Sequence, residues 1–240
     1  MKLGLMLGYS GAELRIPLED VKLAEQLGYD SVWTAEAYGS DAITPLAYIA
    51  AHTDRIRLGT AVLQLAGRTP ANAAMAMATL DQLAGGNRVI CGIGVSGPQI
   101  VEGWYGQPYS KPVTRTREYV DIIRQVLARE APVTSNGEFY PLPYEGPGSW
   151  GMGKPLKPIT HPVRADVPIF IGAEGPKNVT QTAQIADGWL PLYYSPYRQD
   201  VYADQLVAAK EGFEISPTVM VYINDNLNDA LYPVKAMLAF

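Results

Sequence analysis

Glycine residues cluster at one point of the 240-residue chain in a spacing that could place backbone against a ligand. In VICGIGVSGP, residues 89–98, Gly92, Gly94 and Gly97 match the pattern G-x-G-x-x-G. In a dinucleotide-binding domain this pattern follows the first strand and opens a helix at once. Here it follows the fourth strand-like run, and Pro98 with later glycines discourages an immediate long helix. We therefore reject the dinucleotide fingerprint. Two interpretations remain open: glycines that only turn a loop, or glycines that let backbone approach a flat ligand.

A second glycine-rich stretch could hold an anion. GAEGPKN, residues 172–178, follows a strand-like run and leads into a helical pattern. The first N–H groups of a helix lack partners within it and lie at the positive end of its dipole, so they suit a phosphate. The residues expected to shape this site are Gly172, Ala173, Gly175, Pro176 and Lys177, the last as a point charge. The alternative is an ordinary helix start.

Two carboxylates could transfer protons or bind polar groups. Glu36 closes the run VWTAE, and Glu102 lies eight residues after Gly94 in a segment expected to fold over the same end of the sheet. Carboxylates are common general acids and bases. Each could equally be a solvated loop residue. His52 and His161 lie at a helix end and in a long loop, and we expect both to be structural or exposed.

Composition narrows the other possibilities. Cys91 is the single cysteine, which excludes an intramolecular disulfide framework and a multi-cysteine zinc site and fits a reducing, cytoplasmic compartment. The net charge is −5 without blocks of Lys or Arg, so we expect neither nucleic acid nor a membrane surface as a partner. The motifs of zinc hydrolases, P-loop enzymes and α/β-hydrolases are missing from the sequence, and we predict no metal site.

Strand-like and helical patterns alternate along the whole chain. Helical periodicity covers residues 18–27, 43–52, 70–84, 111–130, 177–186 and 200–212. Apolar strand-like runs cover residues 3–8, 31–36, 56–62, 88–94, 168–173, 188–192 and 218–223. Buried strands alternating with helices indicate a parallel sheet. Seven such units without a break favour a (β/α) TIM barrel of the α/β class over a doubly wound sheet, in a single domain spanning residues 1–240.

Two features interrupt this pattern. Residues 131–167 are rich in Pro and Gly, and we predict an insertion in a βα loop on the active-site side. After residue 223 no apolar run remains, so the C-terminal end looks incomplete and the eighth β/α unit is expected to be missing, which leaves a seam between the first and seventh strands. Exposed sheet edges are a liability. We expect either a partner chain to cover them, as in a homodimer, or the chain to be a fragment.

Three stretches together carry a family resemblance. VICGIGVSGPQIVEGWYG, GAEGPKN and ADGWLP resemble the luciferase-like monooxygenase superfamily, and within it the branch of oxidoreductases that depend on coenzyme F420. The resemblance covers almost all of residues 1–240, and the motifs are specific only in combination. It implies a TIM barrel of the bacterial-luciferase type that binds F420, or alternatively FMN, at the C-terminal mouth. It further implies hydride transfer between F420 and a small organic substrate, which the sequence does not identify.

The resemblance also assigns roles to residues. Glu36 matches an acidic residue near the polar edge of the cofactor ring, and Glu102 matches a carboxylate near the reaction centre, where we expect a proton donor with a raised pKa. The bond Ala61–Val62 matches a non-proline cis peptide behind the ring. The cofactor-binding positions are Glu36, Ala61, Val62, Gly94, Ser96, Gly97, Gly172, Ala173, Gly175, Pro176 and Lys177. Ala37 departs from the family, where a histidine is frequent, and puts in doubt any reaction that needs an imidazole base there.

Two alternatives remain beside the F420-dependent oxidoreductase. One is an FMN-dependent monooxygenase that works with a separate reductase. The other is a flavin-binding protein with a shortened barrel and no turnover. In either enzyme the bound group would supply the difficult chemistry, and the protein would supply orientation and electrostatics.

Overall fold

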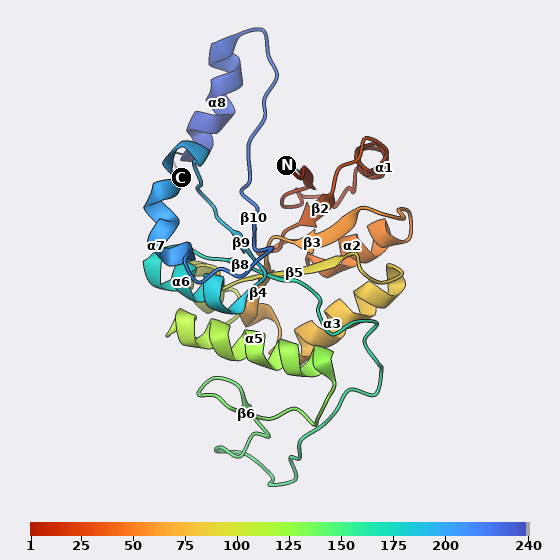
Figure 1. Ribbon diagram of the computed structural model, residues 1–240, viewed down its shortest axis with the longest axis vertical. Helices are drawn as coiled ribbons and strands as arrows, with labels where there is room; N and C mark the ends of the chain where they lie inside the picture. Colours follow the sequence, from red (N-terminus) through yellow and green to blue (C-terminus); the bar gives the residue numbers. More distant parts are fainter. Residues whose placement is uncertain (239–240) are drawn as a thin grey trace.

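Parallel strands form the centre of the computed structural model, which describes residues 1–238 (Figure 1). The strands of the main sheet follow one another in the order β1-β2-β3-β5-β8-β9-β10, and β4 pairs with β5 off this path. Their bounds are β1 Gly4–Met6, β2 Ser31–Thr34, β3 Arg57–Thr60, β4 Leu63–Gln64, β5 Val89–Gly94, β8 Ile169–Gly172, β9 Gly188–Leu190 and β10 Glu214–Ile215. Among the described residues, neighbouring strands of this sheet pair in parallel, which confirms the predicted parallel β/α architecture.

Side chains on the two faces of the strands build two separate cores. Trp33, Ile90 and Phe170 pack together on one face, with the rings of Trp33 and Phe170 centred 5.9 Å apart. Strand neighbours of these residues, such as Val32 and Ile169, belong to the larger core under the helices. Alternate residues of each strand therefore fill two buried faces, as the interior and wall of a curled sheet require.

The helices form an outer layer around this sheet (Figure 1). Their bounds are α1 Leu18–Gln26, α2 Ile43–Ala50, α3 Pro70–Leu83, α4 Pro98–Gly103, α5 Pro112–Ala128, α6 Pro176–Ile185, α7 Ala203–Leu206 and α8 Leu227–Leu238. Two local signals are confirmed: Gly28 takes a positive φ of 82° just after α1, and Pro70 begins α3 with the Thr69 side chain accepting a hydrogen bond from the Asn72 amide. Within residues 1–238, the helices are all too short or too polar to cross a membrane.

The predicted strand at residues 218–223 is wrong. The seventh parallel strand is instead β10, and the following segment leaves the sheet and leads to α8, which projects from the body (Figure 1). The pairing ends here because β9 is followed by Pro191 and β10 is soon followed by Pro217, and proline has no amide hydrogen for the ladder. The helix expected over residues 200–212 is also shorter, because a 3₁₀ turn at Pro196–Tyr202 precedes the four-residue α7.

The long insertion does not lie where the sequence analysis placed it. It connects the end of α5 to the start of β8, so it is an αβ connection and not a βα loop. Its small antiparallel sheet, β6 (Ser135–Asn136) and β7 (Pro141–Leu142), lies beyond α5 from the main sheet (Figure 1). Arg164 ties its end to the buried Asp81 of α3 with a nitrogen–oxygen distance of 2.9 Å. The insertion therefore covers the outer surface of α3 and α5.

Charged residues brace the end of the sheet where the strands begin. Arg57 of β3 bonds both Asp30, just before β2, and Glu214 of β10. Glu214 also accepts from Lys2, just before β1, at 2.8 Å. These bonds link β1 and β10, the two edges of the sheet. Nearby, Asp187 accepts from Arg124, Lys210 and the Ile169 amide, and so joins α5 to β8 and β9.

Candidate functional site at the strand C-termini

The opposite end of the sheet carries the backbone feature that the resemblance predicted. The peptide bond between Ala61 and Val62, directly after β3, is cis, which confirms the prediction for this bond. The Val62 side chain lies against two glycines: a Cβ added to Gly94 would lie 2.6 Å from Val62 Cγ2, and one added to Gly172 would lie 3.1 Å from Val62 Cγ1. Gly94 pairs with Gly172 in the sheet. A Cβ at Gly94 would collide with Val62, and one at Gly172 would require Val62 to shift slightly; we call Val62 with these two glycines the platform.

Glu36 lies just beyond β2 and organises the polar side of this platform. Its side chain is only 4% exposed, and its two oxygens accept from the backbone amides of Ala42 at 3.1 Å and Gln64 at 2.8 Å. The Arg68 guanidinium donates to both oxygens, at 2.8 and 3.0 Å. The Glu36 carboxylate is therefore already surrounded by donors of the protein itself, and its place at the edge of a cofactor ring stays a prediction.

Gln64 is a site residue that sequence reasoning missed. It is buried in β4, and its Nε2 donates to the Glu36 backbone oxygen at 2.7 Å. Its Oε1 is buried and has no hydrogen-bond partner among the described residues. A buried acceptor without a donor is costly, so it marks a place where a ligand donor would be accommodated. The available signal was a polar pair, Gln64 and Arg68, following an otherwise apolar strand.

The GAEGPKN turn has the geometry expected of an open helix start. Gly175 is the N-cap of α6, with φ of 76°, and no side chain caps the helix. A Cβ at Gly175 would meet no atom within 4 Å, so the space before the helix is open. Ala173 is buried, whereas Pro176 and Lys177 are exposed. Because β5 and β8 are neighbours, this turn lies beside the GIGVSG loop.

The segment after β5 begins with unusual backbone and then forms α4. Ser96 takes a positive φ of 60°, and Gly97 is the N-cap of α4. Glu102, near the end of α4, is exposed and accepts from the Tyr109 amide at 3.2 Å. Trp104, two residues after Glu102, is also exposed, at 64%. Glu102 thus braces the loop that follows α4.

A polar cleft of about 180 Å³ lies beside Glu36. Its lining comprises Glu36, Ala37, Gly39, Ser40, Asp41, Gly67, Arg68, Trp104 and Tyr105. The Tyr105 hydroxyl donates to the Ala37 backbone oxygen at 3.4 Å, and its ring lies against Gly67. A phenol therefore lies beside the backbone of Ala37, the residue at which the resemblance implies a frequent histidine. Burial, and after it the negative charge of Glu36, raises the pKa of Tyr105, and the opposing effect of Arg68 is smaller. The Tyr105 hydroxyl therefore stays protonated.

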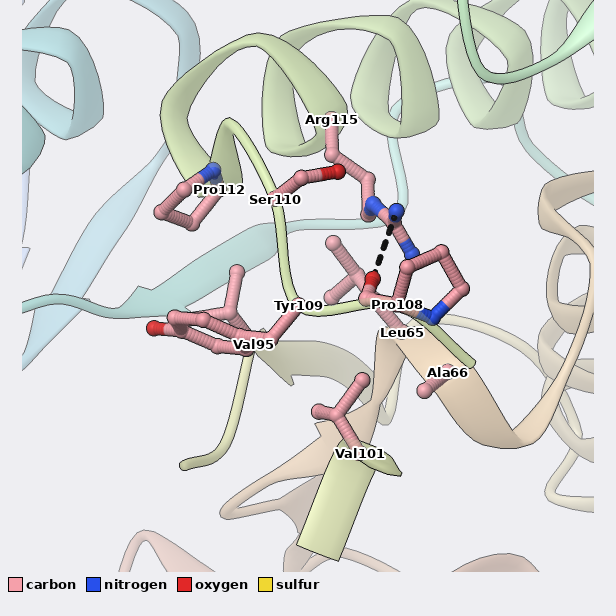
Figure 2. Close-up of a pocket in the computed structure, with 9 residues that line it drawn as sticks. All are labelled: Leu65, Ala66, Val95, Val101, Pro108, Tyr109, Ser110, Pro112 and Arg115. Carbon is pink, nitrogen blue, oxygen red and sulfur yellow. Dashed lines mark hydrogen bonds between the residues drawn. The ribbon is translucent and has the colours of Figure 1, made fainter. Parts of the chain in front are cut away.

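A smaller cavity lies behind the GIGVSG loop, between the start of α5 and α4 (Figure 2). Its volume of about 10 Å³ corresponds to roughly one water molecule. Arg115 points into it from α5 and is 8% exposed. Its Nη2 donates to the Pro108 backbone oxygen at 3.1 Å, and its guanidinium lies 4.5 Å from the centre of the Phe139 ring. Arg115 thereby joins the α4–α5 loop to the insertion.

Both histidines lie away from this cleft. His52 follows α2, is exposed, and has Nδ1 2.8 Å from the Tyr48 backbone oxygen. His161 is exposed in the insertion. Within residues 1–238, no group of three or more His, Cys, Asp or Glu side chains is arranged so that it could hold a metal ion.

Comparison with known proteins places these features in a wider context. A family model described as luciferase-like monooxygenase matches residues 2–240. A protein of Mycobacterium tuberculosis assigned as a coenzyme F420-dependent oxidoreductase is 55% identical over 249 residues, covering 100% of this chain and 72% of that protein. The 5,10-methylenetetrahydromethanopterin reductase of Archaeoglobus fulgidus is 34% identical over 228 residues, covering 92% of this chain and 64% of the reductase.

Solved structures show the same fold. The coenzyme F420-dependent tetrahydromethanopterin reductase from Methanopyrus kandleri matches with a TM-score of 0.81 at 22% identity, over 100% of this chain and 71% of the reductase. An F420-dependent secondary alcohol dehydrogenase, solved with an F420-acetone adduct, matches with a TM-score of 0.78 at 19% identity, over 98% of this chain and 73% of the dehydrogenase. The chain spans between 53% and 72% of the first three curated relatives it matches.

Proposed function

Because this chain belongs to the luciferase-like monooxygenase family, we propose that it is an oxidoreductase that transfers a hydride between coenzyme F420 and a small organic substrate. The observation that carries the proposal is the platform at the C-terminal mouth, where Val62 lies on Gly94 and Gly172 beside the buried, unpartnered Gln64 Oε1. An apolar side chain lying on two glycines, with a buried unpaired acceptor two residues along the chain, suits a deazaflavin ring, which has apolar faces and an N–H at its pyrimidine edge.

The residues around this platform fit the rest of the cofactor. The open turn before α6 offers unpaired backbone N–H groups at the positive end of a ten-residue helix, and Gly175 leaves room for a phosphate to approach. Ser96 and Gly97, with Gly94, form the neighbouring loop. We propose that Gly172, Ala173, Gly175, Pro176 and Lys177 hold the phosphodiester of F420.

Bound F420 would supply hydride chemistry, and the chain would supply position and protons. Glu36 holds Arg68, Gln64 and the start of α2 around the platform, which is a positioning role. We propose that Glu102 exchanges the proton that accompanies the hydride, because α4 follows β5 at this mouth and one carboxylate oxygen can stay on the Tyr109 amide. Ala37 cannot exchange protons, so a chemistry that relies on an imidazole at this position is not proposed.

Identifying the bound cofactor is the experiment that tests this function. The purified chain, loaded separately with F420 and with FMN, is expected to bind F420 more tightly, as followed by the different visible spectra of the two cofactors. Reduced F420 should then be oxidised by an activated carbonyl or alkene acceptor. Tight FMN binding with oxygen-dependent turnover would instead support an FMN-dependent monooxygenase. Binding of either cofactor without turnover would support a flavin-binding protein.

Replacing Gly175 by valine is expected to weaken F420 binding by about 10-fold or more, since the branched side chain blocks the approach of the phosphate to the α6 amides. Valine is also strained at a φ of 76°, so some loss of stability will accompany the change. Equilibrium titration of F420 fluorescence measures the affinity, and thermal unfolding measures the strain.

Gly212→Val is the matched control for this variant. Gly212 has a φ of 79°, open space around its Cβ position, and lies before β10 at the other end of the sheet. It should lose similar stability and keep its affinity for F420. Equal affinities of wild type and a folded Gly175→Val variant would remove the α6 turn from the proposed site.

A further inference from the structure

We propose that Trp189 is a positioning residue that holds the GAEG turn in the conformation needed to bind a phosphate. This inference rests on the proposed function, because it concerns the turn assigned there to the F420 phosphodiester. Trp189 is not itself expected to touch the ligand, since it is fully buried in β9. Its effect would be transmitted through the backbone of residues 172–174.

Three consecutive residues of the turn are each held from β9 or the segment directly after it. Gly172 pairs with Leu190 in the sheet. The Trp189 indole Nε1 donates to the Ala173 backbone oxygen at 2.8 Å. The Leu192 amide donates to Glu174 Oε1 at 2.7 Å. The turn is therefore fixed on its β9 side up to the residue before Gly175, the N-cap of α6.

The indole bond is the central and most rigid of these contacts. Trp189 packs edge-on against Tyr202, with ring centres 4.8 Å apart, and against Tyr194 at 5.9 Å. These rings fix the direction of the indole N–H. Because the Ala173 carbonyl is bound, the peptide that follows it cannot rotate freely, and the amides after it keep one orientation. A preorganised turn avoids the entropy of ordering on binding, which raises affinity without a direct contact.

Trp189→Phe tests the inference by removing the N–H while keeping an aromatic ring. Loss of one neutral hydrogen bond corresponds to about a three- to tenfold change in an equilibrium constant. We expect the Kd of F420 to rise by about that factor. The Kd of the phosphate-free deazaflavin, with the same ring and ribityl chain, should change by less than about twofold. In the ligand-free variant, the Val179 amide, which donates to the Gly175 backbone oxygen at 3.1 Å, should exchange hydrogen faster than in wild type.

Trp33→Phe is the matched control. Trp33 is also buried and donates its indole N–H, to Ser31 Oγ at 2.9 Å, but it makes no bond to the turn. Trp33→Phe should lose similar stability. It should leave unchanged both the ratio of the Kd values for F420 and its phosphate-free analogue and the rate of amide hydrogen exchange at the turn. Glu174→Ala removes the Leu192 contact, and Glu174→Gln loses the same negative charge but keeps an acceptor oxygen for the Leu192 amide, so Glu174→Ala should have the lower preference for F420 of these two variants even if Trp189→Phe folds poorly.

The outcomes separate the two proposals. If wild type binds F420 and its phosphate-free analogue equally, or binds neither, the phosphate site of the proposed function fails, and amide exchange alone then decides whether Trp189 orders the turn. If wild type prefers F420 but Trp189→Phe and Glu174→Ala leave both the preference and the exchange rates at wild-type values, the inference about Trp189 is overturned while the proposed function stands.

Discussion

Glu102→Gln is expected to lower kcat by about 10²–10⁴-fold, the usual contribution of a general acid or base, while the affinity for F420 stays near that of wild type. Hydride transfer to a carbonyl or polarised alkene needs a proton as well, and glutamine cannot supply one. The variant should fold normally, because the amide oxygen can still accept from the Tyr109 amide. Single-turnover oxidation of bound, reduced F420 by such an acceptor measures the chemical step directly.

Two further variants decide what the Glu102 result means. Glu25→Gln is a control, since Glu25 also accepts backbone amides, those of residues 54–56, but at the opposite end of the sheet. It should leave kcat unchanged. Tyr105→Phe tests the rival donor, because the Tyr105 hydroxyl lies beside Ala37 and stays protonated. If kcat falls by less than about threefold in Glu102→Gln but by much more in Tyr105→Phe, Tyr105 and not Glu102 is the proton donor.

Asp187→Asn should lower the free energy of unfolding by about 2–3 kcal/mol, somewhat less than the cost of breaking a fully buried ion pair. Asp187 is 19% exposed and accepts from Arg124, Lys210 and the Ile169 amide. Asparagine keeps the shape but leaves two cations without their counter-charge. Chemical denaturation at neutral pH measures the loss. Asp200→Asn, which removes an exposed ion pair with Arg198, should change the stability by less than about 0.5 kcal/mol.

Acid should remove the contribution of the Asp187 carboxylate to the free energy of unfolding of the wild type. Burial raises the pKa of Asp187, but bonds from Lys210, Ile169 and Arg124 outweigh it, and the pKa lies below the ordinary value of 3.8. A carboxylate with a lowered pKa in the folded state stabilises the fold above its unfolded pKa, and this stabilisation is lost as the pH falls through the folded pKa. The stability gap between wild type and Asp187→Asn should therefore narrow below about pH 4. A gap that stays constant down to pH 2 would contradict this assignment.

Local patterns in the sequence predicted most of the fold, because they depend on neighbouring residues. Strands such as Val89–Gly94 are buried along their whole length, and helices such as Pro70–Leu83 begin with proline after a capping threonine. The run at residues 218–223 misled because its β-branched residues have strand propensity but no adjacent strand with which to pair. Strand formation depends on a partner, and single-sequence propensity does not report one.

Features of the candidate site that depend on backbone geometry, such as the cis bond between Ala61 and Val62, could be predicted from the sequence. Features that depend on contacts between distant side chains could not. The glycines at positions 94 and 172 were singled out as cofactor-binding positions, which stays a prediction, and the structure shows the Val62 side chain close to both. Gln64 and Tyr105 were not recognised as site residues, since their roles come from an unpaired atom and from a contact across 68 residues of sequence. The sequence also did not indicate that Glu102 accepts from the Tyr109 amide of the loop that follows α4.

The position of the insertion has a consequence for how this protein can change over generations. The residues proposed for cofactor and substrate come from segments that follow strands, whereas the insertion follows α5 and packs mainly on α3 and α5, with Arg164 also bonding the Val89 backbone oxygen of β5. Its apolar groove of about 520 Å³ is lined by residues of α3, α5 and the insertion alone. Selection can therefore vary this surface in length and composition separately from catalysis, and a protein engineer could graft a recognition loop there without altering the reaction.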